Sequence, residues 1–253
     1  FAEVSKGYRK VVSTADGSAS LYNIWVRDKD GQMLAELPRG YERQKHFMAM
    51  TVAGGDLWAG LQGGDRYFYW KRYDQRMAMI APNMATRTTG DQESKAPVEN
   101  IFTDQVLLDV PIVAMGPSGQ PVIDLDNLLV GNASSFFGRD GAGLNSRLTE
   151  VKSAKAFPEN IEISVEGPVS GGAIREFHYS ISVIPDNTGY KPRVADTRVG
   201  FFTTSYLDLG KFNNDDKWVR YVNRWKLEKA DPSLSMSPPK EPIVFYIEHT
   251  VPV

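Results

Sequence analysis

Short runs of alternating apolar and polar residues recur along most of this chain, a pattern typical of half-buried β-strands. The clearest run covers residues 157–184, in which Ile161, Ile163 and Val165 alternate with polar residues before a glycine-rich turn at 167–172. The chain then returns with apolar residues again at every second position. This pattern predicts a β-hairpin.

The same signals predict three further hairpins, over residues 21–37, 66–80 and 106–125. The first turns at Asp30-Gly31, a dipeptide that favours the tight turns of hairpins. The last turns at residues 116–119, which contain two glycines and a proline. Strands that follow one another through short turns pair in antiparallel fashion.

Helical signals are few and short. We expect helices at residues 126–130 and 133–137, with Asp124 or Asp126 as the N-cap of the first. A helical turn near residues 97–103 and a short helix opening the segment 39–50 complete the set. The sequence therefore predicts a mainly β protein, either an antiparallel β-sandwich or a strongly curved sheet with a few short helices.

We expect one β-rich domain over residues 1–230, because no shift in composition divides this range. Residues 231–242 are rich in proline and serine and read as a linker. Residues 243–253 open with the apolar run Ile243–Ile247, which has the composition of a buried strand.

Composition excludes several classes of protein. The formal net charge is −2, so a strong field for binding nucleic acid is not expected. No stretch approaches 18 apolar residues, so no membrane-spanning helix is expected. The chain has no cysteine, which removes disulfides, thiol catalysis and cysteine-based zinc sites.

The three histidines, His46, His178 and His249, lie in separate predicted strands, and no H-E-x-x-H motif is present. Zinc hydrolysis needs about three protein ligands around one metal, so we expect structural or surface histidines and no metal site. Asp124 and Asp126 have the spacing of an oxygen-ligand loop, but the rest of a calcium loop is missing. No P-loop or G-x-S-x-G motif is present either.

Fixed charges gather just before the apolar residues Val199 to Phe202. Arg193, Asp196 and Arg198 are our candidates for an ion network, because arginine–carboxylate pairs hold loop geometry well. We expect Arg198 to be partly buried and paired with Asp196 or Asp231. Its loss should then destabilise the fold, since a lone buried ion is costly.

A basic and aromatic segment follows at residues 218–229. Its Trp218, Tyr221, Val222 and Trp225 recur at i, i+3, i+4 and i+7, one face of a helix. A nucleic-acid or membrane surface would suit such a segment, but a packing helix or a packed strand pair is the simpler interpretation. We therefore take Arg224 and Trp225 as structural or interface residues and predict no catalytic residue.

Three stretches of this region carry a family resemblance: PRVADTRVGFF, VRYVNRWKLEKADP and PPKEPIVFYIEHTVP. Their order resembles the junction in a family of large bacterial zinc-dependent metalloproteases, where a DUF5117 domain precedes a metzincin-like catalytic domain. The upstream segments LYNIWVRDKDGQMLAELP, LLDVPIVAMGPSGQPVIDLDNLL and KAFPENIEISVE are similar to that domain too. The resemblance thus covers nearly the whole chain.

The resemblance implies a non-catalytic N-terminal domain that packs on the protease domain and shapes access to its cleft. Residues 243–253 would be the first strand of that catalytic domain, located in the same parent chain or in a separate polypeptide. Zinc is expected in the missing domain and not in this chain, which should be inactive alone. The resemblance also implies a periplasmic or secreted bacterial protein and a peptide substrate.

The residues alone are also compatible with two other classes of protein. One is a stand-alone β-sandwich module that binds peptide or polysaccharide, which an exposed row of Tyr67, Tyr69 and Trp70 would favour. The other is a self-contained hydrolase, against which the number and spacing of the histidines argue.

Overall fold

The computed structural model describes residues 1–212 and 215–247. The chain divides into two compact units. Unit 1 consists of Phe1–Asn83 and Ile101–Asp186, and unit 2 of Met84–Asn100 and Asn187–Val253. The range 1–230, which the composition suggested to be one domain, is thus shared between two units, and unit 2 is assembled from two separate stretches of chain.

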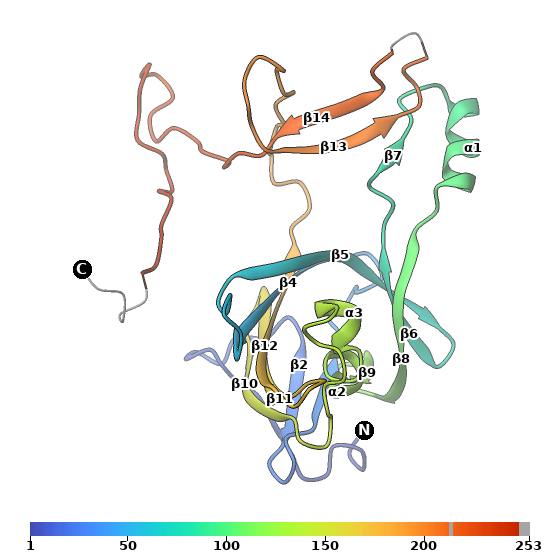
Figure 1. The fold of residues 1–253 in the computed structure, drawn as a ribbon, viewed down its shortest axis with the longest axis vertical. Helices are drawn as coiled ribbons and strands as arrows, with labels where there is room; N and C mark the ends of the chain where they lie inside the picture. The colour runs from blue at the N-terminus through green and yellow to red at the C-terminus, as the bar shows by residue number, and fades with distance from the viewer. Residues whose placement is uncertain (213–214, 248–253) are drawn as a thin grey trace. The chain divides into compact units, whose positions relative to one another are not determined.

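Unit 1 is built on one curled antiparallel sheet of eleven strands in the described part of the chain (Figure 1). The expected mainly β class is confirmed, in its strongly curved form. In spatial order the strands are β1 (Tyr8–Lys10), β2 (Asn23–Arg27), β3 (Met33–Glu36), β9 (Pro121–Asp124), β8 (Gln105–Met115), β6 (Arg76–Ala81), β5 (Gln62–Tyr73), β4 (Lys45–Gly54), β12 (Ile174–Ile184), β11 (Asn160–Pro168) and β10 (Glu150–Ala156).

The four predicted hairpins are all present. β2 pairs with β3, β5 with β6, β8 with β9 and β11 with β12. The turn after β2 contains Gly31 at φ 70°, a conformation that side chains other than glycine rarely adopt. The helix expected to open residues 39–50 is wrong, because residues 40–43 form turns before β4 begins. Strand β10 was not predicted.

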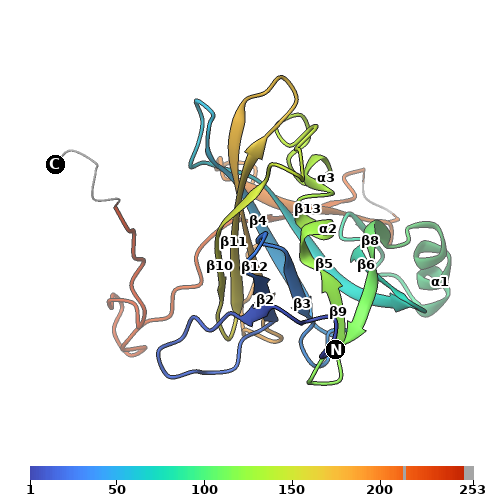
Figure 2. The same cartoon turned by 90° about the horizontal axis from the view of Figure 1, so that it is seen from below.

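The core lies on the concave face of this sheet, where alternate residues of β4, β11 and β12 are buried. On β12 these residues are Phe177, Tyr179 and Ile181. Two short helices, α2 (Leu125–Leu129) and α3 (Ala133–Phe137), pack there, as Figures 1 and 2 show. The Tyr179 hydroxyl donates a hydrogen bond to the Leu129 carbonyl at 2.6 Å.

One hydrogen bond shows which of the two candidate residues, Asp124 or Asp126, is the N-cap of α2. Asp124 is the N-cap of α2, because its Oδ1 accepts the N–H of Asn127 at 3.0 Å. Asp126 instead turns to the neighbouring hairpin, where its Oδ2 accepts the Met33 N–H at 2.5 Å. Burial raises the pKa of Asp126 to about 7.

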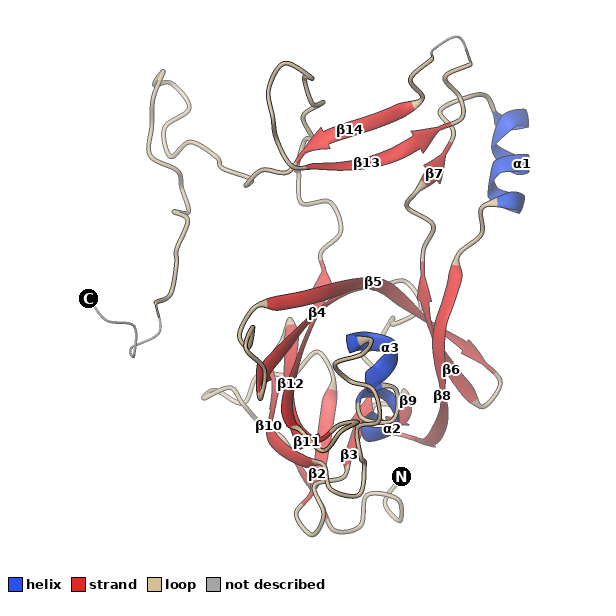
Figure 3. Ribbon diagram, viewed as in Figure 1, coloured by secondary structure: helices blue, strands red, loops and turns tan. Residues whose placement is uncertain are grey.

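Unit 2 has little regular structure. Its sheet has three strands in the order β14 (Trp218–Val222), β13 (Thr203–Asp208) and β7 (Thr86–Arg87), and β7 runs parallel to β13. Helix α1 (Gln92–Ile101), coloured blue in Figure 3, begins earlier than the helical turn we expected and has no buried residue. Trp218–Val222 is a strand, so the strand-pair alternative is right there and the helical alternative is wrong.

The C-terminal stretch carries no strand in its described part. Lys229 and Pro239 form an isolated bridge, and residues 243–247 have no regular structure. Their apolar side chains are exposed, Tyr246 by 95%. Residues 248–253, with His249, lie outside the described residues, so the strand of a catalytic domain over 243–253 stays a prediction.

Candidate functional site

The predicted site residues gather around the outer edge of β14 in unit 2. The segment at Arg193 to Ala195 pairs there through an isolated antiparallel bridge between Val194 and Tyr221. The N–H of Val222 donates to the Arg193 carbonyl at 2.9 Å, and the N–H of Ala195 donates to the Arg220 carbonyl at 2.8 Å. The backbone thus places Arg193 beside β14, and Arg224 and Trp225 directly follow that strand.

Asp196 and Arg198 form a pair within one tight turn. The Arg198 Nη2 lies 2.5 Å from Oδ2 of Asp196, and the Arg198 backbone N–H donates to Oδ1 at 3.0 Å. The hydrogen bonds from Arg198 hold the pKa of the Asp196 carboxyl below its ordinary value. The expected pairing with Asp196 is confirmed, whereas Asp231 binds the Ser233 hydroxyl and backbone N–H.

The expected burial of Arg198 is wrong, because its side chain is 85% exposed. The apolar residues that follow it do not enclose it: Phe201 is exposed and Phe202 is 90% exposed. An exposed ion pair contributes little to stability. The pair closes the turn, and the neighbouring phenylalanines are exposed to solvent.

Arg224 organises a second feature of this edge. Its guanidinium stacks 5.0 Å from the centre of the Tyr190 ring, and its Nη2 donates to the Lys191 carbonyl at 2.7 Å. These contacts hold the chain before Arg193 against the end of β14. Beside them lies a hollow of about 400 Å³, whose lining includes Tyr190, Pro192, Tyr221 and Arg224.

Exposed aromatic side chains lie on the two segments that flank one end of the β13–β14 pair. The N–H of Asn223 donates to the Phe202 carbonyl at 2.9 Å, which brings Phe202 close to the segment that carries Trp225. Trp225 is 63% exposed. We call Phe201, Phe202, Trp225 and Leu227, all exposed, the aromatic edge.

Asp208 is a buried residue that sequence reasoning missed. Its carboxylate accepts the backbone N–H of Thr89 at 2.9 Å, the Thr89 hydroxyl at 2.8 Å and the N–H of Gly210 at 3.0 Å. Burial alone would raise the pKa of Asp208, but these hydrogen bonds outweigh burial and hold it below its ordinary value. The Asp-x-Gly spacing signals the local turn, while no local pattern points to Thr89.

The described histidines serve packing and hydrogen bonding. His46 is fully buried, its ring lies 5.2 Å from that of Phe68, and burial lowers its pKa to about 4. The His178 Nε2 lies 2.7 Å from a carboxylate oxygen of Glu162. Among residues 1–212 and 215–247, no three His, Asp or Glu side chains are arranged to hold a metal ion.

The fold and this edge define a β-rich protein domain whose second unit exposes apolar side chains. A family model described as "Domain of unknown function (DUF5117)" matches residues 60–230. The match spans more than half of the chain, which therefore belongs to the DUF5117 family. No curated protein and no solved structure matches the chain. In the described part of the chain, no helix is long and apolar enough to cross a membrane.

Proposed function

We propose that this chain is the non-catalytic N-terminal domain of a secreted or periplasmic zinc-dependent metalloprotease, and that it packs on the protease domain and shapes access to its cleft. One observation carries the proposal. Among the described residues of unit 2, Val222 is the only hydrophobic side chain that is buried, while the aromatic edge is open to solvent.

Exposed apolar residues gathered at one place mark surfaces that bind a partner. Aromatic residues are enriched in the buried centres of protein interfaces, where they contribute most of the binding energy. The aromatic edge offers two phenylalanines and a tryptophan, and the hydrogen bond from the Asn223 N–H to the Phe202 carbonyl joins the two segments that carry them. A protease domain that packs on the aromatic edge would bury these exposed side chains.

The apolar run Ile243–Ile247 supports the same partner. It is the segment that resembles the first strand of a metzincin-like domain, and its side chains are exposed here. Burying one such side chain is worth about 1.5–3 kcal/mol. A partner sheet that pairs with this run would therefore gain considerable stability.

The residues of this chain do not fit a catalytic zinc. The sequence has no H-E-x-x-H motif, and the two described histidines are engaged in unit 1, one in its core and one with Glu162. In the proposed arrangement the metal and the general base belong to the partner domain. The contribution of this chain is then steric and structural.

Immunoprecipitation of the native protein from its own cells tests the proposal. We expect a complex or polypeptide larger than 28.2 kDa that carries zinc and chelator-sensitive peptidase activity. Phe202→Asp and Trp225→Asp together should weaken the association with the peptidase. Leu57→Asp, at a residue of unit 1 that is 90% exposed, is the matched control. A native protein of 28.2 kDa without peptidase would contradict the proposal.

The alternative of a stand-alone binding module gains no support from β5. Trp70 is buried in the core and its indole N–H donates to the Tyr22 hydroxyl at 2.9 Å. Tyr67 and Tyr69 lie on the other face of the strand, and the Tyr69 hydroxyl donates to Asp104. The three side chains therefore form no exposed row.

A further inference from the structure

The two end strands of the unit 1 sheet, β1 and β10, come close without pairing. The gap between β10 and the β1–β2 hairpin, which we call the seam, is closed at one end by hydrogen bonds. There the Leu21 N–H donates to the Phe157 carbonyl and the Ala156 N–H donates to the Ser13 hydroxyl, both at 2.8 Å. At the other end Gly31 lies against Val151.

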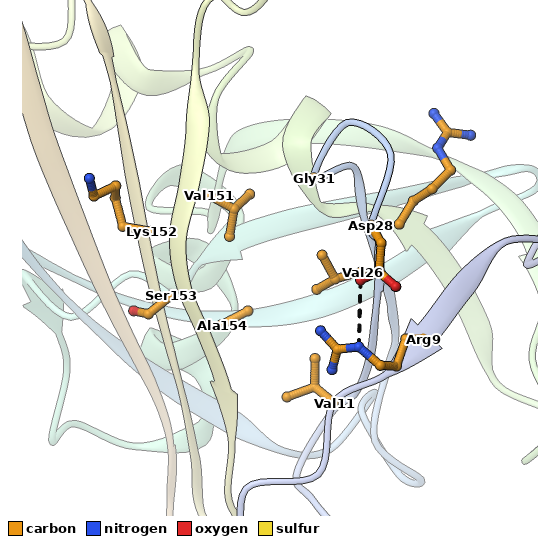
Figure 4. A pocket seen from close by; sticks show the side chains of 10 residues that line it. Arg9, Val11, Val26, Asp28, Gly31, Val151, Lys152, Ser153 and Ala154 are labelled. Atoms are coloured by element: carbon orange, nitrogen blue, oxygen red, sulfur yellow. Dashed lines mark ion pairs between the residues drawn. The ribbon is translucent and has the colours of Figure 1, made fainter.

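Between these closures the seam is hollow. One hollow of about 290 Å³ is lined by residues that include Val11, Val26, Val151 and Ala154. Figure 4 shows Val151 and Ala154 on one side, facing Val11 and Val26 on the other. A second hollow of about 390 Å³ adjoins the first, because Arg9, Val11 and Ala154 line both, and we call the two hollows together the groove.

The backbone of β10 offers hydrogen-bonding groups to this groove. Alternate residues of an antiparallel strand direct their N–H and C=O groups to the same side. The Ala156 N–H crosses the seam to Ser13, so the N–H and C=O of Ala154 also point into the seam. No hydrogen bond from a described residue crosses the seam at Ala154.

Basic residues outnumber acidic ones in the lining of the groove, although Arg27 pairs with Asp30 at 2.6 Å and Lys152 with Glu166 at 3.3 Å. Four basic residues border the two hollows, against one acidic residue, Asp28. The basic residues are Arg9, Arg27, Lys152 and Lys155. Among the described residues, Arg9 forms one ion pair, with Asp28 at 3.5 Å, and its side chain is 64% exposed. Lys155 has no ion pair within the described residues.

We propose that the seam binds an extended acidic peptide segment, which adds to the edge of β10. Its backbone pairs with Ala154, one apolar side chain enters the hollow between Val26 and Val151, and flanking carboxylates meet Arg9 and Lys155. Side chains of a strand alternate between two faces, so the groove selects an acidic–apolar–acidic order. Addition of a strand to a free sheet edge is a general mode of peptide recognition. The seam lies within unit 1, and this inference stands independently of the proposed function.

Fluorescence anisotropy with a labelled hexapeptide of alternating valine and aspartate tests the inference on the full chain. We expect saturable binding that weakens as salt is added, since screening reduces the attraction between exposed charges. A hexapeptide of alternating valine and lysine should bind at least tenfold more weakly. Equal binding of the two peptides would overturn the proposal.

Two variants locate the site. Ala154→Pro removes the outward N–H, a change that edge strands tolerate, and should weaken binding by about tenfold, the value of one hydrogen bond. Lys155→Glu reverses an exposed charge and should weaken binding by about fivefold. Lys45→Glu is the matched control. Lys45 is exposed on β4, a strand with a neighbour on both sides, and this variant should bind the peptide as the wild type does.

Two results would contradict the assignment. Unchanged binding by both seam variants, with melting temperatures like that of the wild type, would place the peptide elsewhere. Self-association of the wild-type chain that Lys155→Glu abolishes would show that a second copy fills the seam instead. Lys155→Glu keeps the test decisive if Ala154→Pro does not fold.

Discussion

Unit 1 and unit 2 are stabilised in different ways. All buried hydrophobic side chains among the described residues belong to unit 1, except Val222. Unit 2 is held instead by the pairing of β13 with β14, by hydrogen bonds to Asp208 and by the Arg224–Tyr190 contact. Burial of apolar surface dominates folding stability, whereas each hydrogen bond contributes a net 0.5–1.5 kcal/mol, roughly. Unit 1 therefore has the apolar core that folding requires, whereas the described part of unit 2 has almost none.

The largest expected effect is in the core of unit 1. Trp70→Ala removes a buried indole and its hydrogen bond to Tyr22, and should cost about 3–5 kcal/mol of unfolding free energy. Urea unfolding measures the loss. Trp58→Ala, at a tryptophan that is 71% exposed, is the control and should change stability little. Equal losses in the two variants would contradict the described core.

A pH-dependent effect of about 2 kcal/mol is expected at Asp126. Burial raises its pKa to about 7, so its stabilising contribution is complete below pH 4 and is lost as pH rises through 7. Asp126→Asn keeps an oxygen for the Met33 N–H and removes the titration. Buried His46, with its pKa lowered to about 4, has the opposite pH dependence, so the variant must be compared with the wild type.

The measurement is the difference in unfolding free energy between Asp126→Asn and the wild type at several pH values. This difference should grow in favour of the variant from pH 5 to pH 8. A constant difference over that range would show that Asp126 is already charged in the folded protein.

In unit 2, Asp208→Ala should cost about 1–2 kcal/mol locally, because the Thr89 and Gly210 N–H groups lose their acceptor. Hydrogen exchange should become faster in β13 and remain unchanged in β11 and β12. The lowered pKa of Asp208 means that its contribution is present above pH 4 and is lost on further acidification. Asp231→Asn, in an exposed turn, is the control. Equal acceleration in both units would mean that they unfold together.

The smallest expected effect concerns the C-terminal stretch. Deletion of residues 241–253 should leave the melting temperature nearly unchanged, since the apolar side chains of residues 243–247 are exposed. The deletion should also reduce self-association, measured by analytical ultracentrifugation. A fall of many degrees in melting temperature would place this stretch in the core of the protein.

The sequence predicted the elements that depend on neighbours along the chain. The four hairpins follow from alternation and turn residues, and the Asp196–Arg198 pair closes within three residues. Contacts between distant segments could not be predicted: β4 pairs with β12 and Asp208 binds Thr89, each across more than 100 residues. Strand β10 has the sequence EVKSAKA, which is made mostly of small and charged residues. The alternation of large apolar and polar residues that predicts a strand is therefore absent from it. At residues 218–222 a helical spacing of aromatics coincided with a strand.

The order of segments in unit 2 has a consequence for biosynthesis. On the ribosome, residues 84–100 emerge long before their partners, because the whole of residues 101–186 must be translated between β7 and β13. The Thr89 N–H therefore has no Asp208 carboxylate to bind while the strands of unit 1 are being translated. In a nascent chain that stalls before residue 208, residues 84–100 lack the β13 strand with which β7 pairs. Unit 2 is thus the last part of the described chain that can assemble, and a fragment beginning at residue 187 should not reproduce it.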